Sequence, residues 1–317
     1  MRVERIGETF FAEIDDIDIA GGFDEATWIA FRNAYLEHQV LALHDQSLTA
    51  AQFHAFGERF GPVEPHTVSM YHHEEFAGIT VLSNRTEMGR PKGIRDAGSS
   101  WHSDYSYKPV PANATMLYAL EVPAEGGDTI FADLAAAYDT LPGSMKERLN
   151  GLRVRQQYRW SRDRAHPEAR WNLLNDTERE KTPEVIHPLV RTHPETGRKG
   201  LYISDAVSTG VKDIVGMEAD ASRALIDELF THSQDPRFQV RYKWRIGEAP
   251  LRRVANREKK MPRRFISKDG FGVTAAGRAY FEPLIAGEAY PPYEKGMPRY
   301  ARLKKVLVPK RCTPWSG

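Results

Sequence analysis

The chain has 317 residues, of which 41% are hydrophobic and 27% charged, enough for one large soluble domain or two ordinary ones. Its 44 Lys and Arg residues nearly balance 43 Asp and Glu residues, so a net charge of +1 gives no reason to expect a nucleic-acid or anionic membrane partner. A single cysteine, Cys312, excludes an internal disulfide framework and a multi-cysteine zinc or iron–sulfur site.

The N-terminal stretch MRVERIGETFFAEIDDIDIA is acidic and has no continuous apolar core, so we do not expect it to act as a signal peptide. No run of about 18 apolar residues occurs, and we expect no transmembrane span. A lone cysteine suits a reducing compartment. These features together predict a soluble, cytoplasmic protein.

Two amphipathic helices with a strand between them are predicted for the N-terminal part of the chain. Apolar side chains recur at helical spacing along each helix, so we expect the aromatic ones to form core rather than a cofactor site. The helices cover 23 to 38 and 47 to 62, the strand covers 39 to 45, and the aromatic residues are Trp28, Phe31, Tyr35, Phe53, Phe56 and Phe60.

Short strands and long loops follow Gly61. Strands are predicted at 78 to 84, 114 to 123, 128 to 133 and 237 to 247, with two more joined by a turn within 184 to 204. Two short helices are predicted in 134 to 152, a longer one at 219 to 233, and a polar lid or excursion between 153 and 184. Many strands with helices gathered at one end favour an α+β domain built on a β-sandwich or barrel.

The stretch WHSDYSY contains a possible metal-binding pair, His102 and Asp104. In a strand, side chains two positions apart point to the same face, so the imidazole and the carboxylate can converge on one ion. A second histidine would complete the 2-His-1-carboxylate set of Fe(II) oxygenases. On spacing alone, two polar residues on the solvent face of a strand are the commoner explanation.

Four longer stretches carry a resemblance over about residues 10 to 247. They read HQVLALHDQSLTAAQFHAFGERFGPVEPH, WHSDYSYKPVPANATMLYALEVPAEGGDTIFADLAAAYDTLP, HPLVRTHPETGRKGLYIS and FQVRYKWRIGE. Together they resemble the taurine dioxygenase and 2,4-dichlorophenoxyacetate dioxygenase family, whose members use Fe(II) and 2-oxoglutarate. The resemblance implies a double-stranded β-helix, or jelly roll, with flanking helices.

The resemblance also implies roles for individual residues. His102 and Asp104 fall at the first two iron ligands, Thr129 at a threonine that binds 2-oxoglutarate, and His66 near a histidine that contacts the acidic group of the substrate. Trp101 is expected to pack beside the site. The implied reaction consumes oxygen and 2-oxoglutarate and hydroxylates a small organic acid, such as a taurine-like sulfonate or an aryloxyalkanoate. Members of the family are often oligomeric, so the resemblance leaves a homo-oligomer as an alternative to a monomer.

The family pattern breaks after FQVRYKW. A stretch of the type W-D-N-R-x-x-x-H should supply the second histidine near position 259, which is Lys259, and an arginine for 2-oxoglutarate should follow. No histidine occurs after His232, so we expect both groups to be missing. Other candidate ligands are expected to be structural or surface residues: His187, His193, His232 and Glu258.

The stretch from 254 to 311 instead resembles the C-terminal end of pyrophosphate-dependent 6-phosphofructokinases, through MPRRFI, PLIAGEAYPPY and GMPRY. It carries no catalytic residue of that enzyme. We therefore expect an oxygenase domain at 1 to 247 whose last strands are replaced by a foreign tail at 248 to 317, poorly packed or partly disordered. The leading hypothesis is a 2-oxoglutarate-dependent oxygenase with an incomplete iron site. The alternatives are a non-catalytic organic-acid-binding protein and an inactive fusion product.

Overall fold

The computed structural model describes residues 1–87, 90–91, 93–94, 101–123, 126–158, 177, 180, 182–204, 210–246, 251–253, 256–259 and 303–307. Within these residues, no helix is both long enough and apolar enough to cross a membrane. The join between the oxygenase part and the tail is expected near Gly247 to Leu251; residues 247–250 of it and most of the tail lie outside the described residues.

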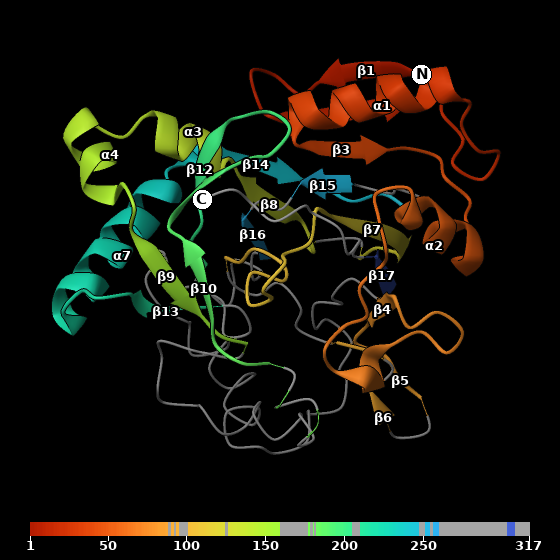
Figure 1. Ribbon diagram of the computed structural model, residues 1–317. Helices are drawn as coiled ribbons and strands as arrows, with labels where there is room; N and C mark the ends of the chain where they lie inside the picture. Colours follow the sequence, from red (N-terminus) through yellow and green to blue (C-terminus); the bar gives the residue numbers. More distant parts are fainter. Residues whose placement is uncertain are drawn as a thin grey trace.

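A seven-stranded sheet forms the larger layer of the fold (Figure 1). Its neighbouring strands are antiparallel except for the parallel pair β2 and β3. In sheet order the strands are β1 (Arg2–Arg5), β2 (Phe11–Asp15), β3 (Val40–Leu43), β15 (Leu251–Arg253), β7 (Ala114–Glu121), β17 (Leu303–Leu307) and β4 (Ile79–Leu82).

Smaller sheets complete the strand content of the described residues. The sheet that faces the larger one has the order β14 (Gln239–Tyr242), β8 (Thr129–Ala132) and β16 (Asn256–Lys259). A second has the order β10 (Val185–Pro188), β9 (Arg153–Gln156) and β13 (Val211–Ile214). Two-stranded pairs join β11 (Val190–Thr192) to β12 (Lys199–Leu201) and β5 (Thr86–Glu87) to β6 (Arg90–Pro91).

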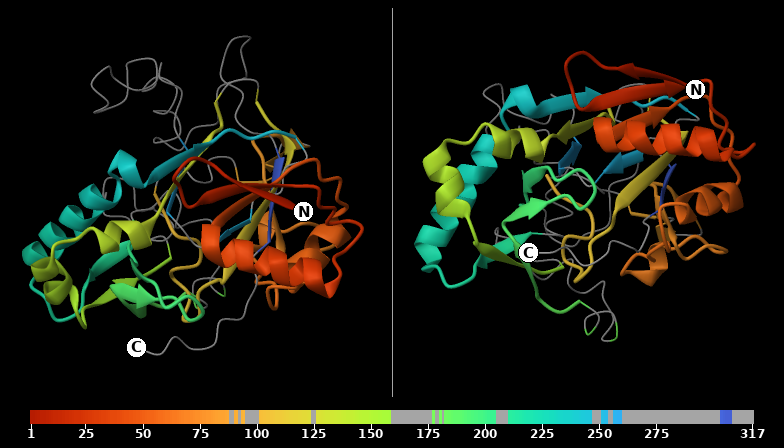
Figure 2. Two further views of the ribbon diagram at one scale, coloured as in Figure 1. Left: turned by 90° about the horizontal axis from the view of Figure 1, so that it is seen from above. Right: turned by 45° about the horizontal axis from the view of Figure 1, so that its top comes forward.

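Helices lie on opposite sides of these sheets, with α3, α4 and α7 together on one side and α1 and α2 on the other (Figures 1 and 2). Asp24 caps the first helix by accepting from the Thr27 amide, and Thr49 and Gln52 form a capping box on the second. The bounds are α1 (Glu25–His38), α2 (Ala50–Glu58), α3 (Leu134–Asp139), α4 (Gly143–Leu149) and α7 (Ala219–Ser233), with 3-10 turns η1 (Ser69–Tyr71) and η2 (Pro236–Phe238).

Strand β7 is buried on both faces, and its alternation separates two hydrophobic clusters. Met116 and Tyr118 pack with the aromatic residues of α1 and α2, which confirms that these aromatics form core. Leu117 and Ala119 point the other way, where they meet Phe131 of β8 and residues of β14. The two sheets therefore pack face to face as a sandwich, as the strand pattern predicts.

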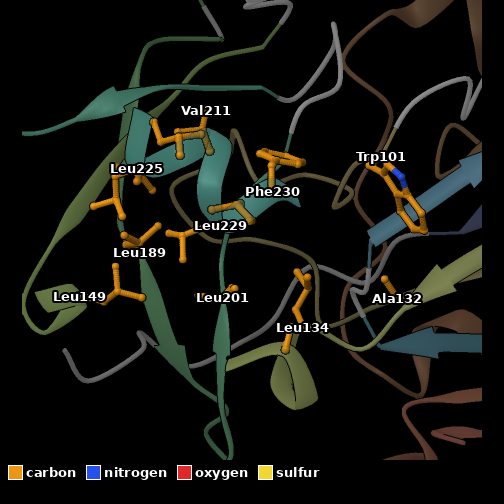
Figure 3. Close-up of a cluster of buried hydrophobic side chains, with 14 of the residues drawn as sticks. Trp101, Ala132, Leu134, Leu149, Leu189, Leu201, Val211, Leu225, Leu229 and Phe230 are labelled. Carbon is orange, nitrogen blue, oxygen red and sulfur yellow. The ribbon is translucent and has the colours of Figure 1, made fainter. Parts of the chain in front are cut away.

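A third cluster surrounds α7, whose predicted and observed bounds coincide. Leu225, Leu229 and Phe230 of this helix pack against β11 to β13 and α3 (Figure 3). Trp101 belongs to the same cluster and lies at its far end, beside Ala132 of β8 (Figure 3). The segment that carries His102 is thus anchored to the outer face of the smaller sheet.

One prediction differs from the structure. The polar stretch beginning at Arg153 starts as strand β9, because Val154 and Gln156 are buried while Arg153 and Arg155, which alternate with them, face outward. Three short strands after residue 250 pair with the sheets: β15 and β17 lie in the interior of the larger sheet, and β16 pairs with β8. Backbone pairing needs only N–H and C=O groups, so such strands can form with varied side chains.

Candidate metal centre

His102 and Asp104 converge in the structure. Nε2 of His102 lies 3.1 Å from Oδ1 of Asp104, and their side chains are 10% and 19% exposed. Two ligands at right angles on one ion, each with a bond of roughly 2.1 Å, are about 3.0 Å apart. The pair therefore has donor types that a divalent first-row ion binds, and its separation is compatible with two ligands of one ion as well as with a direct imidazole–carboxylate contact.

The pair does not lie on a continuous strand, as its spacing suggested. His102 makes a single bridge, and the chain turns from Asp104 to Tyr107. Tyr105 adopts a left-handed backbone with φ of 58°, which cannot continue a strand. The Lys108 amide donates to the Tyr105 carbonyl at 2.9 Å and closes the turn.

His187 of β10 holds this turn from outside. Its Nε2 donates to the Lys108 carbonyl at 2.9 Å, so the ring is engaged in positioning the turn. Burial, together with the charge of Arg191, lowers the pKa of His187 to about 4, despite hydrogen bonds to the carbonyls of Lys108 and Ser106. The imidazole is therefore neutral at physiological pH.

The described residues supply no third ligand. They contain no group of three His, Cys, Asp or Glu side chains that could hold a metal ion. His232 donates its Nε2 proton to the Ala137 carbonyl, and Nδ1 of His193 accepts from the Glu195 and Thr196 amides. Strand β16 places position 259 opposite Thr129 of β8 in the antiparallel register.

Thr129 is fully buried and points into the space between the sheets, two residues before Phe131. The indole Nε1 of Trp244 donates to its Oγ1 at 2.8 Å. Because the indole N–H occupies one lone pair of Oγ1, the hydroxyl proton of Thr129 is oriented to donate to another acceptor, such as a carboxylate. Sequence reasoning missed Trp244, although it continues the buried alternation of Val240 and Tyr242 on β14.

His66 lies in a group of rings that also includes residues of the Asp104 turn. Its Nδ1 lies 3.0 Å from the Val68 amide nitrogen and 3.3 Å from the Val68 carbonyl oxygen; the tautomer that accepts from the amide, the shorter contact, carries its proton on Nε2. Its ring centroid is 5.9 Å from that of Tyr71 and 6.5 Å from that of Tyr158. The aromatic cluster, as we call it, consists of Val68, Tyr71, Tyr105, Tyr107, Ala112 and Tyr158.

Within the aromatic cluster, Tyr105 stacks on Tyr107 at 5.7 Å and Tyr107 contacts Tyr158 at 4.6 Å between centroids. Burial raises the pKa of both Tyr105 and Tyr107 well above its ordinary value. Both phenols are therefore neutral. The cluster joins His66 to the turn at Asp104 and forms a buried, ring-rich group that begins at the residue after Asp104.

Solved structures share this fold. A complex of AAD-2 with Mn(II) and N-oxalylglycine has a TM-score of 0.72 at 22% identity and covers 99% of this chain and 100% of that one. A putative α-ketoglutarate-dependent 2,4-D dioxygenase from Burkholderia xenovorans has a TM-score of 0.64 at 26% identity, covering 81% of this chain and 90% of that one.

The C-terminal part has a different relative. A pyrophosphate–fructose 6-phosphate 1-phosphotransferase from Xanthomonas campestris is 53% identical over 77 residues, which are 24% of this chain and 18% of that enzyme. The resemblance of the tail to such enzymes is thereby confirmed. The match covers too little of that enzyme for its activity to be carried over to this chain.

Curated relatives match most of the chain. An (S)-phenoxypropionate/α-ketoglutarate dioxygenase from Sphingobium herbicidovorans is 32% identical over 250 residues, covering 77% of this chain and 83% of the relative. An α-ketoglutarate-dependent 2,4-dichlorophenoxyacetate dioxygenase from a Burkholderia species is 31% identical over 260 residues, with coverages of 77% and 83%. The model of the taurine catabolism dioxygenase TauD, TfdA family matches residues 2–249, and the chain belongs to this family.

Proposed function

We propose that this protein is an oxygenase that uses Fe(II) and 2-oxoglutarate to hydroxylate a small organic acid, with an iron site that lacks its third protein ligand. The observation that carries the proposal is the separation of 3.1 Å between His102 and Asp104 in a family member. His102 and Asp104 would hold the iron. The bound metal and its co-substrate would supply the oxidising chemistry.

The remaining residues bind and orient. Thr129 donates its hydroxyl proton to a carboxylate of 2-oxoglutarate, and the Trp244 indole fixes the direction of that proton. His66 offers its Nε2 proton to the acidic group of the substrate. The low exposure of the Asp104 and His102 side chains keeps bulk water from the reacting atoms.

An aryloxyalkanoate is the substrate class that we favour over a sulfonate. The named substrates of two relatives are phenoxypropionate and 2,4-dichlorophenoxyacetate. The aromatic cluster supports the same class here, because its rings offer stacking and edge contacts to an aryl group. We place the reaction in the cytoplasm.

The incomplete ligand set predicts weak iron binding and little coupled turnover. The chain contains no histidine after His232, and the family position near 259 is a lysine. The second candidate function is therefore a non-catalytic protein that keeps the sandwich for binding an organic acid.

Calorimetry with 2-oxoglutarate, with and without Fe(II) under anaerobic conditions, separates the two functions. Binding that requires metal and is lost in His102→Ala supports the oxygenase. Equal binding without metal supports the binding protein. Substrate-dependent succinate formation at an ordinary enzymatic rate would contradict the incomplete site and imply a further ligand.

A further inference from the structure

The phenolic hydroxyl of Tyr105 is buried without a hydrogen-bond partner. Tyr105 as a whole is only 6% exposed. Two other buried tyrosine hydroxyls are paired: that of Tyr107 with Thr67 at 3.0 Å, and that of Tyr118 with the Gln46 carbonyl at 2.9 Å. A buried donor left unpaired is costly and calls for a ligand or water that completes it.

The backbone at Tyr105 is also unusual. A left-handed φ of 58° is rare for a bulky side chain, and such strain concentrates at functional sites. The turn places Tyr105 directly after Asp104 and stacks its ring on Tyr107. The unpaired donor therefore belongs to the residue that links Asp104 to the stacked rings.

The surroundings of this hydroxyl select the kind of acceptor. The aromatic cluster is made of rings and of the small apolar side chains Val68 and Ala112. Lys108 lies 5.9 Å from the Tyr107 ring centroid, but its Nζ is 3.5 Å from the Glu64 carboxylate, so its charge is already matched. A second anion there would be a buried, unpaired charge, whereas a neutral oxygen would not.

We propose that Tyr105 recognises the substrate, donating its hydroxyl proton to the ether oxygen of an aryloxy acid. The rings of Tyr107 and Tyr158 contact the aryl group, and the carboxylate of the acid lies toward His66. This assignment rests on the proposed function, and it deepens that function by naming the substrate atom that the protein recognises. It makes Tyr105 a specificity-determining residue, with no proton transfer assigned to it.

The test compares two acids that differ at one atom. Phenoxyacetate carries the ether oxygen, and 3-phenylpropanoate has a methylene in its place. Calorimetry measures both with the full chain in the presence of Mn(II) and 2-oxoglutarate. We expect Tyr105→Phe to weaken the binding of phenoxyacetate by about threefold to tenfold, which is the range for one neutral hydrogen bond. The affinity for 3-phenylpropanoate should be unchanged.

Two controls accompany the variant. Tyr35→Phe removes a buried hydroxyl outside the aromatic cluster, one that donates to the Asn113 carbonyl at 3.1 Å, and should not alter the preference between the acids. The urea midpoint of Tyr105→Phe should be unchanged or higher than that of the wild type, because an unpaired buried hydroxyl is removed.

Each outcome bears on the assignment. An unchanged ether preference in Tyr105→Phe, or an equal loss for both acids, overturns the role of Tyr105 while the proposed function stands. A wild-type chain that binds 2-oxoglutarate but neither acid also overturns the Tyr105 assignment alone. A chain that binds neither the acids nor 2-oxoglutarate contradicts the proposed function as well.

Discussion

Acidification should destabilise this protein through His187, the residue that holds the turn after Asp104. Its Nε2 donates to the Lys108 carbonyl, and burial and the charge of Arg191 lower its pKa to about 4. The unfolded chain binds the proton near the ordinary pKa of 6.5, whereas the folded chain resists it. The contribution is thus fully present above pH 6.5 and is lost as the pH falls toward 4.

The size of the loss follows from the two pKa values. The difference between 6.5 and about 4 corresponds to roughly 3 kcal/mol of unfolding free energy once both states are protonated. Between about pH 7.5 and about pH 5, linkage predicts a loss of about 2 kcal/mol from this residue. That is a large share of the stability of an ordinary domain.

Urea unfolding of the wild type and of His187→Gln at both pH values measures this term. Glutamine keeps an N–H donor for the Lys108 carbonyl but does not titrate, so other acid-sensitive groups cancel in the comparison. We expect the wild type to lose about 2 kcal/mol more than the variant. Equal losses in the two proteins would refute the reasoning.

Three further predictions concern the core, the co-substrate and the metal. Phe53→Ala should lower the unfolding free energy by about 3–5 kcal/mol in urea titration, because the ring is fully buried; a loss under about 1 kcal/mol would contradict the core assignment. Trp244→Phe should weaken the binding of 2-oxoglutarate, measured by calorimetry, by about threefold to tenfold, since Thr129 loses the donor at 2.8 Å that orients its hydroxyl. Unchanged affinity would refute the role of Trp244 in orienting Thr129. Lys259→His should tighten Mn(II) binding in calorimetric titration, because β16 brings position 259 opposite Thr129; an unchanged constant would show that this position cannot complete the site.

Much of the fold was predictable where pattern and burial agree. The helix at 219 to 233 matches α7 because its apolar stripe is regular and Glu218 caps it. Strand β9 was missed because Arg153 and Arg155 alternate with buried residues and make the stretch read as a polar loop. The strands β15 to β17 were unexpected because pairing is a property of the backbone, which the side-chain pattern of the tail does not report.

The candidate site was predictable only in part. The spacing of His102 and Asp104 suggested convergence, but the structure achieves it through a turn rather than a strand. A left-handed Tyr105 has no sequence signal, since bulky residues rarely adopt that backbone. The contact between Trp244 and Thr129 joins residues 115 positions apart, which local patterns cannot reveal.

The central claim, that His102 and Asp104 form a metal-binding pair, is tested most directly by Mn(II) titration of the wild type, His102→Ala and Asp104→Ala, followed by electron paramagnetic resonance. His54→Ala is the matched control, because His54 lies 3.6 Å from the Glu58 carboxylate on the surface of α2. We predict one weak site that His102→Ala and Asp104→Ala each weaken by more than about a hundredfold, beyond the roughly 10- to 100-fold loss for an outer-shell partner, and that His54→Ala leaves intact. Equal Mn(II) binding by all four proteins would contradict the account.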